Sequence, residues 1–127
     1  MKMTEKLKKL LCVEDNPDEC ELVKEVLSEF EVTCSDSLEE AKARLGSGSF
    51  DVVIIDEHLT DGSGMSLCKS IARTDASVPI ILISGDPYVT AGEARDAGAR
   101  VFLTKGTRSY IDDLRRFANI LAKTATA

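Results

Sequence analysis

The stretch FDVVIIDEHLTDGSGM, Phe50 to Met65, decides the fold of this chain, because it runs from apolar residues straight into a carboxylate. Residues 52–55 are Val-Val-Ile-Ile, and Asp56 follows them directly. A continuous apolar run of this length is typical of a strand covered on both faces, as in a parallel sheet. Ligands of open parallel sheets bind beyond the carboxyl ends of the strands. A buried strand that ends on Asp56 therefore predicts a polar site at that edge of the sheet.

The same kind of apolar run recurs along the chain. The predicted strands are Lys9–Val13, Val32–Ser35, Val52–Ile55, Ile80–Ile83 and Val101–Leu103. Helical patterns with capping residues follow each of them, and we predict helix starts at Asn16-Pro17, Ser37, Met65, Asp86-Pro87 and Ser109. The fourth helix contains Tyr-Val-Thr-Ala-Gly at residues 88–92, which is a poor helix-forming sequence, so we expect it to be the least stable.

Strands that alternate with helices predict an α/β fold with a five-stranded parallel sheet. We expect the strand order 2-1-3-4-5, with helices on both faces of the sheet. The chain has 127 residues, which is the length of one domain. We therefore expect a single domain over residues 1–127, with a core from about residue 8 to about residue 121 and flexible termini.

Composition excludes several classes of function. The net charge of −6 argues against a nucleic-acid-binding face and against an anionic membrane surface. No segment approaches the ~20 apolar residues of a membrane span, and the N-terminus lacks the features of a signal peptide. The chain has four cysteines and no C-x-x-C pair; they are Cys12, Cys20, Cys34 and Cys68. We expect them to be small core residues of a protein in a reducing, cytoplasmic compartment. The alternative is a zinc site or a disulfide framework.

Polar residues end or follow four of the predicted strands. They are Glu14-Asp15, Asp56, Ser84-Gly85 and Thr104-Lys105. In a parallel sheet these ends meet, which brings three carboxylates, a hydroxyl and an ammonium to one crevice. Two unit charges ~4 Å apart repel by about 4 kcal/mol at an effective dielectric constant of ~20, and a divalent cation removes that cost. Because the donors are all hard oxygens, Mg²⁺ or Mn²⁺ suits the site and zinc does not.

A carboxylate beside Mg²⁺, with an ammonium and a hydroxyl facing it, has the features of a phosphoryl acceptor. The carboxylate oxygen of Asp56 is then the nucleophile, the cation and Lys105 balance the charge of the incoming group, and Ser84 hydrogen-bonds one of its oxygens.

Four motifs, LLCVEDN, VVIIDEHLTDGSGM, IILISGD and VFLTKG, resemble the receiver domain of bacterial two-component response regulators. The resemblance covers the chain from about Lys8 to about Leu121 and implies a flavodoxin-like, CheY-like three-layer fold. It implies that Asp56 is the phosphorylated residue and that Glu14, Asp15, Asp56 and the main-chain carbonyl of His58 bind Mg²⁺. It also implies that Ser84 is the switch hydroxyl, Lys105 the phosphate-binding lysine and Phe102 the switch aromatic residue, with Gly64 after the acceptor loop.

The resemblance implies a signalling switch rather than an enzyme. A histidine kinase or a histidine phosphotransfer protein supplies the phosphoryl group. The surface of the fourth helix, fifth strand and fifth helix then changes and acts on a downstream protein that the sequence does not identify. We expect neither nucleic acid nor membrane to be a direct partner.

The chain departs from the family pattern at two positions where proline is usual, Thr60 and Gly106. The family's Lys-Pro bond is commonly cis, and a cis bond before a residue other than proline costs ~2.5–4 kcal/mol. We therefore predict a trans Lys105–Gly106 bond, with Gly106 free to adopt a positive φ.

Two other functions share parts of this chemistry. A Mg²⁺-dependent phosphohydrolase with an aspartate nucleophile needs an acid–base Asp two residues after Asp56, where this chain has His58. A degenerate receiver binds a partner without being phosphorylated, and the intact set of site residues argues against it.

Overall fold

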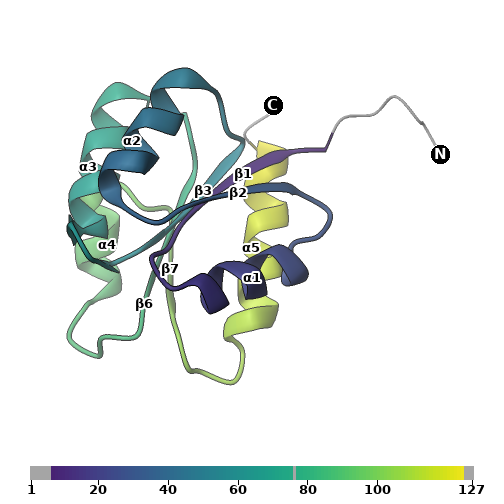
Figure 1. Ribbon diagram of the computed structural model, residues 1–127. Helices are drawn as coiled ribbons and strands as arrows, with labels where there is room; N and C mark the ends of the chain where they lie inside the picture. Colours follow the sequence, from purple (N-terminus) through teal and green to yellow (C-terminus); the bar gives the residue numbers. More distant parts are fainter. Residues whose placement is uncertain (1–6, 76, 125–127) are drawn as a thin grey trace.

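The computed structural model describes residues 7–75 and 77–124, which form a parallel sheet between two layers of helices (Figure 1). The strands of the sheet are β1 (Lys9–Val13), β2 (Glu31–Ser35), β3 (Val52–Asp56), β6 (Ile80–Ser84) and β7 (Val101–Thr104). They lie in the order β2-β1-β3-β6-β7, and every neighbouring pair is parallel. The predicted order 2-1-3-4-5 is confirmed, because β6 and β7 are the fourth and fifth strands of the sheet.

The helices cover both faces of this sheet. Figure 1 shows α1 (Pro17–Val26) and α5 (Tyr110–Thr124) on one side, and α2 (Leu38–Ser47), α3 (Gly64–Thr74) and α4 (Ala91–Ala97) on the other. Successive strand residues point to opposite faces, so Leu10 and Ile54 join the core under α1 and α5, while Leu11 and Ile55 join the core under α2 and α3. Burial on both faces explains why the strands are apolar without alternation.

The first two helices begin where the capping residues predict. The Asn16 side chain accepts hydrogen bonds from the backbone N–H groups of Asp18 and Glu19, and Pro17 occupies the first helical position. The Ser37 hydroxyl accepts from the N–H of Glu40 at 3.1 Å. These caps satisfy donors that a helix start otherwise leaves without a partner.

The predicted start of the fourth helix is wrong. Asp86 accepts a hydrogen bond from the N–H of Tyr88 at 2.8 Å and so closes a turn, and α4 begins only at Ala91. Thr90 and Glu93 form a reciprocal capping box there. A Thr-x-x-Glu cap is a stronger start signal than Asp86-Pro87, because it satisfies two backbone donors and is followed by better helix formers.

Two further features were not predicted. Residues 58–63 form a small antiparallel hairpin of β4 (His58–Leu59) and β5 (Gly62–Ser63).

Cys20 and Cys34 form a disulfide, which corrects their assignment as free core cysteines, whereas Cys12 and Cys68 are free and buried as predicted. Cys20 and Cys34 meet because α1 packs beside β2, which leaves their Cα atoms 6.4 Å apart.

The two ends of the chain concern the predicted flexible termini and the predicted extent of the core. The flexible termini predicted from the sequence fall partly on residues 1–6 and 125–127, which lie outside the described residues. Helix α5 continues to Thr124, beyond the predicted end of the core. In the part of the chain that the structure describes, no helix combines the length and the apolar character that crossing a bilayer requires.

Candidate functional site

The carboxyl edge of the sheet brings the predicted acidic residues together. Glu14 and Asp15 directly follow β1, and Asp56 is the last residue of β3, the neighbouring strand. One carboxylate oxygen from each of these three residues lies within 4.8 Å of the others. Glu14 and Asp56 are buried, at 3% and 6% exposure, and Asp15 is partly exposed. The crevice therefore holds three acidic groups, two of them largely removed from water.

Lys105 supplies the positive charge that faces these acids. Its Nζ donates to Glu14 Oε1 at 2.8 Å and to Asp56 Oδ2 at 3.1 Å. Its backbone N–H donates to the carbonyl of Ser84 at 2.9 Å, which fixes the chain where it leaves β7. One ammonium thus bridges carboxylates that lie at the ends of two neighbouring strands.

The burial of Glu14 has an electrostatic consequence. Desolvation, assisted by the charge of Asp56, raises the pKa of Glu14 from 4.5 to about 7, although Lys105 opposes that shift. Burial alone lowers the pKa of Lys105, but its hydrogen bond to Glu14 and the charge of Asp56 outweigh that effect and raise it. The single ammonium does not fully compensate the acidic groups.

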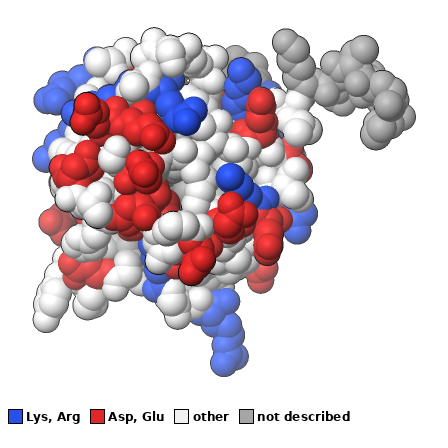
Figure 2. Space-filling model, in the orientation of Figure 1, with Lys and Arg blue, Asp and Glu red and all other residues white. Residues whose placement is uncertain are grey.

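The donor set fits a hard divalent cation. All three groups are carboxylates, which are the ligands that Mg²⁺ prefers, and no thiolate or imidazole belongs to the cluster among the described residues. Figure 2 shows acidic side chains outnumbering basic ones on the face that carries α1 and α2. When bound, Mg²⁺ neutralises negative charge and holds oxygen ligands in a fixed arrangement.

Ser84 and Phe102 occupy the last two strands of the sheet. Ser84 ends β6, is fully buried, and its Oγ accepts from the N–H of Asp86 at 3.0 Å. Phe102 lies in β7 beside Leu82 of β6, is half-buried, and packs against the core under α3 and α4.

The loop after β3 is held by Glu57, a residue to which the sequence analysis gave no role. Glu57 is buried, and its Oε1 accepts from Ser63 Oγ at 2.7 Å and from the N–H of Met65 at 3.2 Å. Gly64 lies so close to the main chain of Asp56 that an added Cβ would clash with the Asp56 carbonyl oxygen. Together these contacts hold the β4–β5 hairpin against the strand that carries Asp56.

Two more polar contacts at the rim were also missed. Asp61, at the tip of the hairpin, accepts from the N–H groups of Leu38 and Glu39 at the start of α2, at 2.9 and 3.2 Å. The exposed His58 side chain lies with its Nε2 3.2 Å from Asp86 Oδ2. The only sequence signal for these pairs was the density of acids in the loops, which does not identify partners.

The Lys105–Gly106 prediction is confirmed. The described residues contain no cis peptide bond, and Gly106 has a φ of +84°. A glycine adopts this backbone conformation at little cost, so the loop after Lys105 turns through Gly106 with a trans peptide bond.

Comparisons with known proteins agree with this arrangement. The model of the response regulator receiver domain matches residues 10–116. The response regulator PilR of Pseudomonas aeruginosa is 32% identical over 117 residues, which are 90% of this chain and 25% of PilR. The regulatory protein VirG of Agrobacterium fabrum is 33% identical over 117 residues, which are 87% of this chain and 46% of VirG. The chain thus spans only a quarter to just under half of these relatives.

Solved structures of response regulators have the same fold as this chain. The response regulator TrrA of Thermotoga maritima, in complex with Mg²⁺-BeF, has a TM-score of 0.81 and 28% identity, covering 91% of this chain and 99% of that one. The receiver domain of a Francisella response regulator has a TM-score of 0.82 and 27% identity, covering 91% and 97% of the two chains. Family match and fold together establish that the chain belongs to the receiver domain family of two-component response regulators.

Proposed function

We propose that this domain is a phosphorylation switch in which Asp56 accepts a phosphoryl group in the presence of Mg²⁺. The observation that carries the proposal is a cluster of three carboxylates at the carboxyl edge of the sheet, two of which pair with the ammonium of Lys105. A phosphoryl acceptor needs a positioned oxygen nucleophile and compensating positive charge more than it needs covalent chemistry.

In the proposed transfer, a carboxylate oxygen of Asp56 attacks the phosphorus atom of a phosphohistidine on a histidine kinase or a histidine phosphotransfer protein. The O–P bond forms as the N–P bond breaks, and the leaving imidazole takes up a proton from solvent. Lys105 faces the new phosphoryl oxygens, since its Nζ already lies 3.1 Å from Asp56 Oδ2. The Ser84 hydroxyl donates to one of those oxygens.

Glu14, Asp15, Asp56 and the main-chain carbonyl of His58 are the proposed ligands of the cation. The cluster of the three side chains supports this assignment, and the position of His58 in β4, two residues after Asp56, supports the fourth ligand. Mn²⁺, another hard cation with oxygen ligands, is expected to substitute for Mg²⁺.

Phosphorylation then alters the surface of α4, β7 and α5. When the Ser84 hydroxyl turns toward the phosphoryl group, it gives up its present hydrogen bond from the N–H of Asp86. Phe102 lies on the adjacent strand and is only half-buried, so it has room to follow. We propose that this shifts the population between two states of the domain, and that a downstream protein in the cytoplasm binds one of them.

The test is phosphorylation by a small phosphodonor such as acetyl phosphate. The wild type should gain one phosphoryl group in the presence of Mg²⁺, and mass spectrometry of peptides should place it on Asp56. Asp56→Asn should abolish the label, while Asp96→Asn, which changes an exposed acid of α4, should not. Undiminished labelling of Asp56→Asn, or wild-type labelling that survives chelation of Mg²⁺, would refute the proposal.

A further inference from the structure

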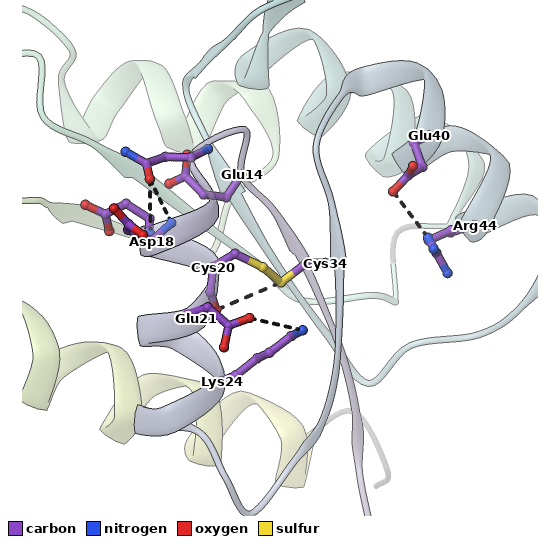
Figure 3. Close-up of a disulfide and its surroundings, with 10 residues drawn as sticks. Glu14, Asp18, Cys20, Glu21, Lys24, Cys34, Glu40 and Arg44 are labelled. Atoms are coloured by element: carbon purple, nitrogen blue, oxygen red, sulfur yellow. Dashed lines mark hydrogen bonds and ion pairs between the residues drawn. A yellow bond between two sulfur atoms is a disulfide. The ribbon is translucent and has the colours of Figure 1, made fainter.

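Cys20 and Cys34 join two elements at the edge of the sheet. Cys20 lies in the first half of α1 and Cys34 lies in β2, and Figure 3 shows the disulfide between them. Their Cα atoms are 6.4 Å apart, within the range of about 4.4–6.8 Å that disulfides span. The Cys34 sulfur is also 4.0 Å from the Cys20 carbonyl oxygen, so in the reduced protein it can donate a weak S–H hydrogen bond. The fold therefore places the two cysteines where the bond can form.

The same two cysteines line a pocket that reaches the acidic site. The pocket has a volume of about 260 Å³, and Glu14 and Asp15 form part of its wall, as do Asp36 and Glu40. The disulfide therefore adjoins two of the three carboxylates of the acidic cluster.

The disulfide also fixes both anchors of the loop that carries those carboxylates. Glu14 is anchored to β2, because its N–H donates to the carbonyl of Ser35 at 2.9 Å. The other end of the loop is Asn16, whose side chain caps α1. A bond between α1 and β2 sets the distance between these two anchors, and so limits how far Glu14 and Asp15 can move.

We propose that Cys20 and Cys34 are a reversible thiol–disulfide site that is coupled to the binding of the cation by Glu14 and Asp15. This rests on the proposed function, which provides both the cation and the reducing compartment. Disulfides in such a compartment are usually transient and often redox-sensing rather than structural. The co-reactant is a low-molecular-weight disulfide such as oxidised glutathione.

The exchange proceeds in two balanced steps. The thiolate of one cysteine attacks a sulfur of the small disulfide, forms a mixed disulfide and releases one small thiol. The thiolate of the other cysteine attacks the mixed disulfide at the protein sulfur, forms the Cys20–Cys34 bond and releases a second small thiol. The two protein thiols lose two electrons to the small disulfide, and their protons pass to the two thiolates that leave.

The oxidised protein binds the cation more tightly, because its acidic loop is already held in place and loses less freedom on binding. Coupling between two equilibria is reciprocal, so the cation raises the equilibrium constant for oxidation by the same factor. A factor of about five or more is the ordinary range for such coupling.

The experiment measures Mg²⁺ binding by titration calorimetry, with Mg²⁺ alone as the ligand. The wild type is compared after equilibration with oxidised or with reduced glutathione, and its redox state is verified by mass. The oxidised form should bind at least about fivefold more tightly. Cys20→Ser and Cys34→Ser should each give one affinity under both conditions, near that of the reduced wild type.

Cys68→Ala is the matched control, because this buried thiol belongs to α3, on the other face of the sheet, and its loss should leave the redox dependence intact. Desolvation raises the pKa of the Cys12 and Cys68 thiols to about 12, so neither competes in the exchange. Equal Mg²⁺ affinity of the oxidised and reduced wild type would overturn the proposal, as would failure of the disulfide to form with oxidised glutathione. Loss of Asp56 labelling with the redox dependence intact would refute only the proposed function.

Discussion

Glu14 is a buried carboxyl group that binds its proton more tightly in the folded protein than in the unfolded chain. Its pKa rises from 4.5 to about 7 on folding, so between these two pH values the unfolded chain gives up this proton first. The unfolded state is thereby favoured as pH rises. In Mg²⁺-free buffer we expect the free energy of unfolding to fall by about 1–3 kcal/mol from pH 4.5 to pH 7.

Urea unfolding followed by circular dichroism over this pH range measures the effect. Glu14→Gln, which cannot ionise, should flatten the fall. Glu25→Gln changes an exposed acid of α1 and should reproduce the wild-type profile. A Glu14→Gln profile as steep as the wild type would assign the pH dependence to another group.

Lys105 stabilises the metal-free fold because it bridges Glu14 and Asp56, and only 19% of its side chain is exposed. Lys105→Met keeps the apolar stem but leaves two buried carboxylates without their cation. Breaking such a pair costs more than an exposed ion pair contributes, and we expect a loss of about 1–3 kcal/mol at pH 8 without Mg²⁺.

Mg²⁺ should restore most of that loss, because a divalent cation compensates the same carboxylates. Thermal unfolding of Lys105→Met with and without Mg²⁺ tests this, and Lys69→Met, an exposed lysine of α3, is the control. A Lys105→Met loss that Mg²⁺ leaves unchanged would mean that the lysine and the cation do not share these ligands.

The β4–β5 hairpin connects the strand of Asp56 to two helices. Glu57 and Ser63 tie it to the start of α3, and Asp61 caps the start of α2. We predict that Asp61→Ala exposes the first amides of α2, so that hydrogen exchange at Leu38 and Glu39 becomes faster than in the wild type. Asp96→Ala, which removes an exposed acid of α4, should leave both amides protected. Unchanged exchange in Asp61→Ala would show that Ser37 alone caps α2.

The elements differ in how well the sequence predicts them, for a physical reason. Apolar strands and locally capped helices such as α1 follow from residues near in sequence, because Asn16 finds its donors two and three residues ahead. The start of α4 also had a local signal, Thr90 with Glu93, but Asp86-Pro87 was preferred. The hairpin and its contacts had no local signal, because Asp61 binds amides 22 and 23 residues away.

The same distinction applies to the candidate site. Glu14, Asp15, Asp56 and Lys105 were predicted to converge because the order of parallel strands places their ends together. The geometry within the site was beyond prediction, because the bridge that Lys105 makes between Glu14 and Asp56 depends on side-chain packing. The role of Glu57 was not predicted for the same reason, because its contact with Ser63 depends on the fold of the hairpin.

The five β-α units share one sheet. Among the described residues, the disulfide is the only covalent cross-link between distant parts of the chain. Cys20 and Cys34 are 14 residues apart, and they enclose the rest of α1, the following turn and most of β2. In the unfolded chain this bond removes the freedom of that segment, and by the chain-entropy account a loop of this length contributes about 3 kcal/mol to stability.

We therefore predict that reduction of the disulfide lowers the free energy of unfolding by about 3 kcal/mol at pH 7, as measured by urea unfolding with and without dithiothreitol. Cys20→Ser should match the reduced wild type in both buffers, because the serine cannot close the loop. Cys68→Ala should keep the full difference between the two buffers, because it leaves the disulfide in place. If reduction left the stability unchanged in Mg²⁺-free buffer, the loop-entropy account would be wrong. With saturating Mg²⁺ the loss should be larger, because the oxidised protein binds the cation more tightly and a ligand of the native state adds to its stability.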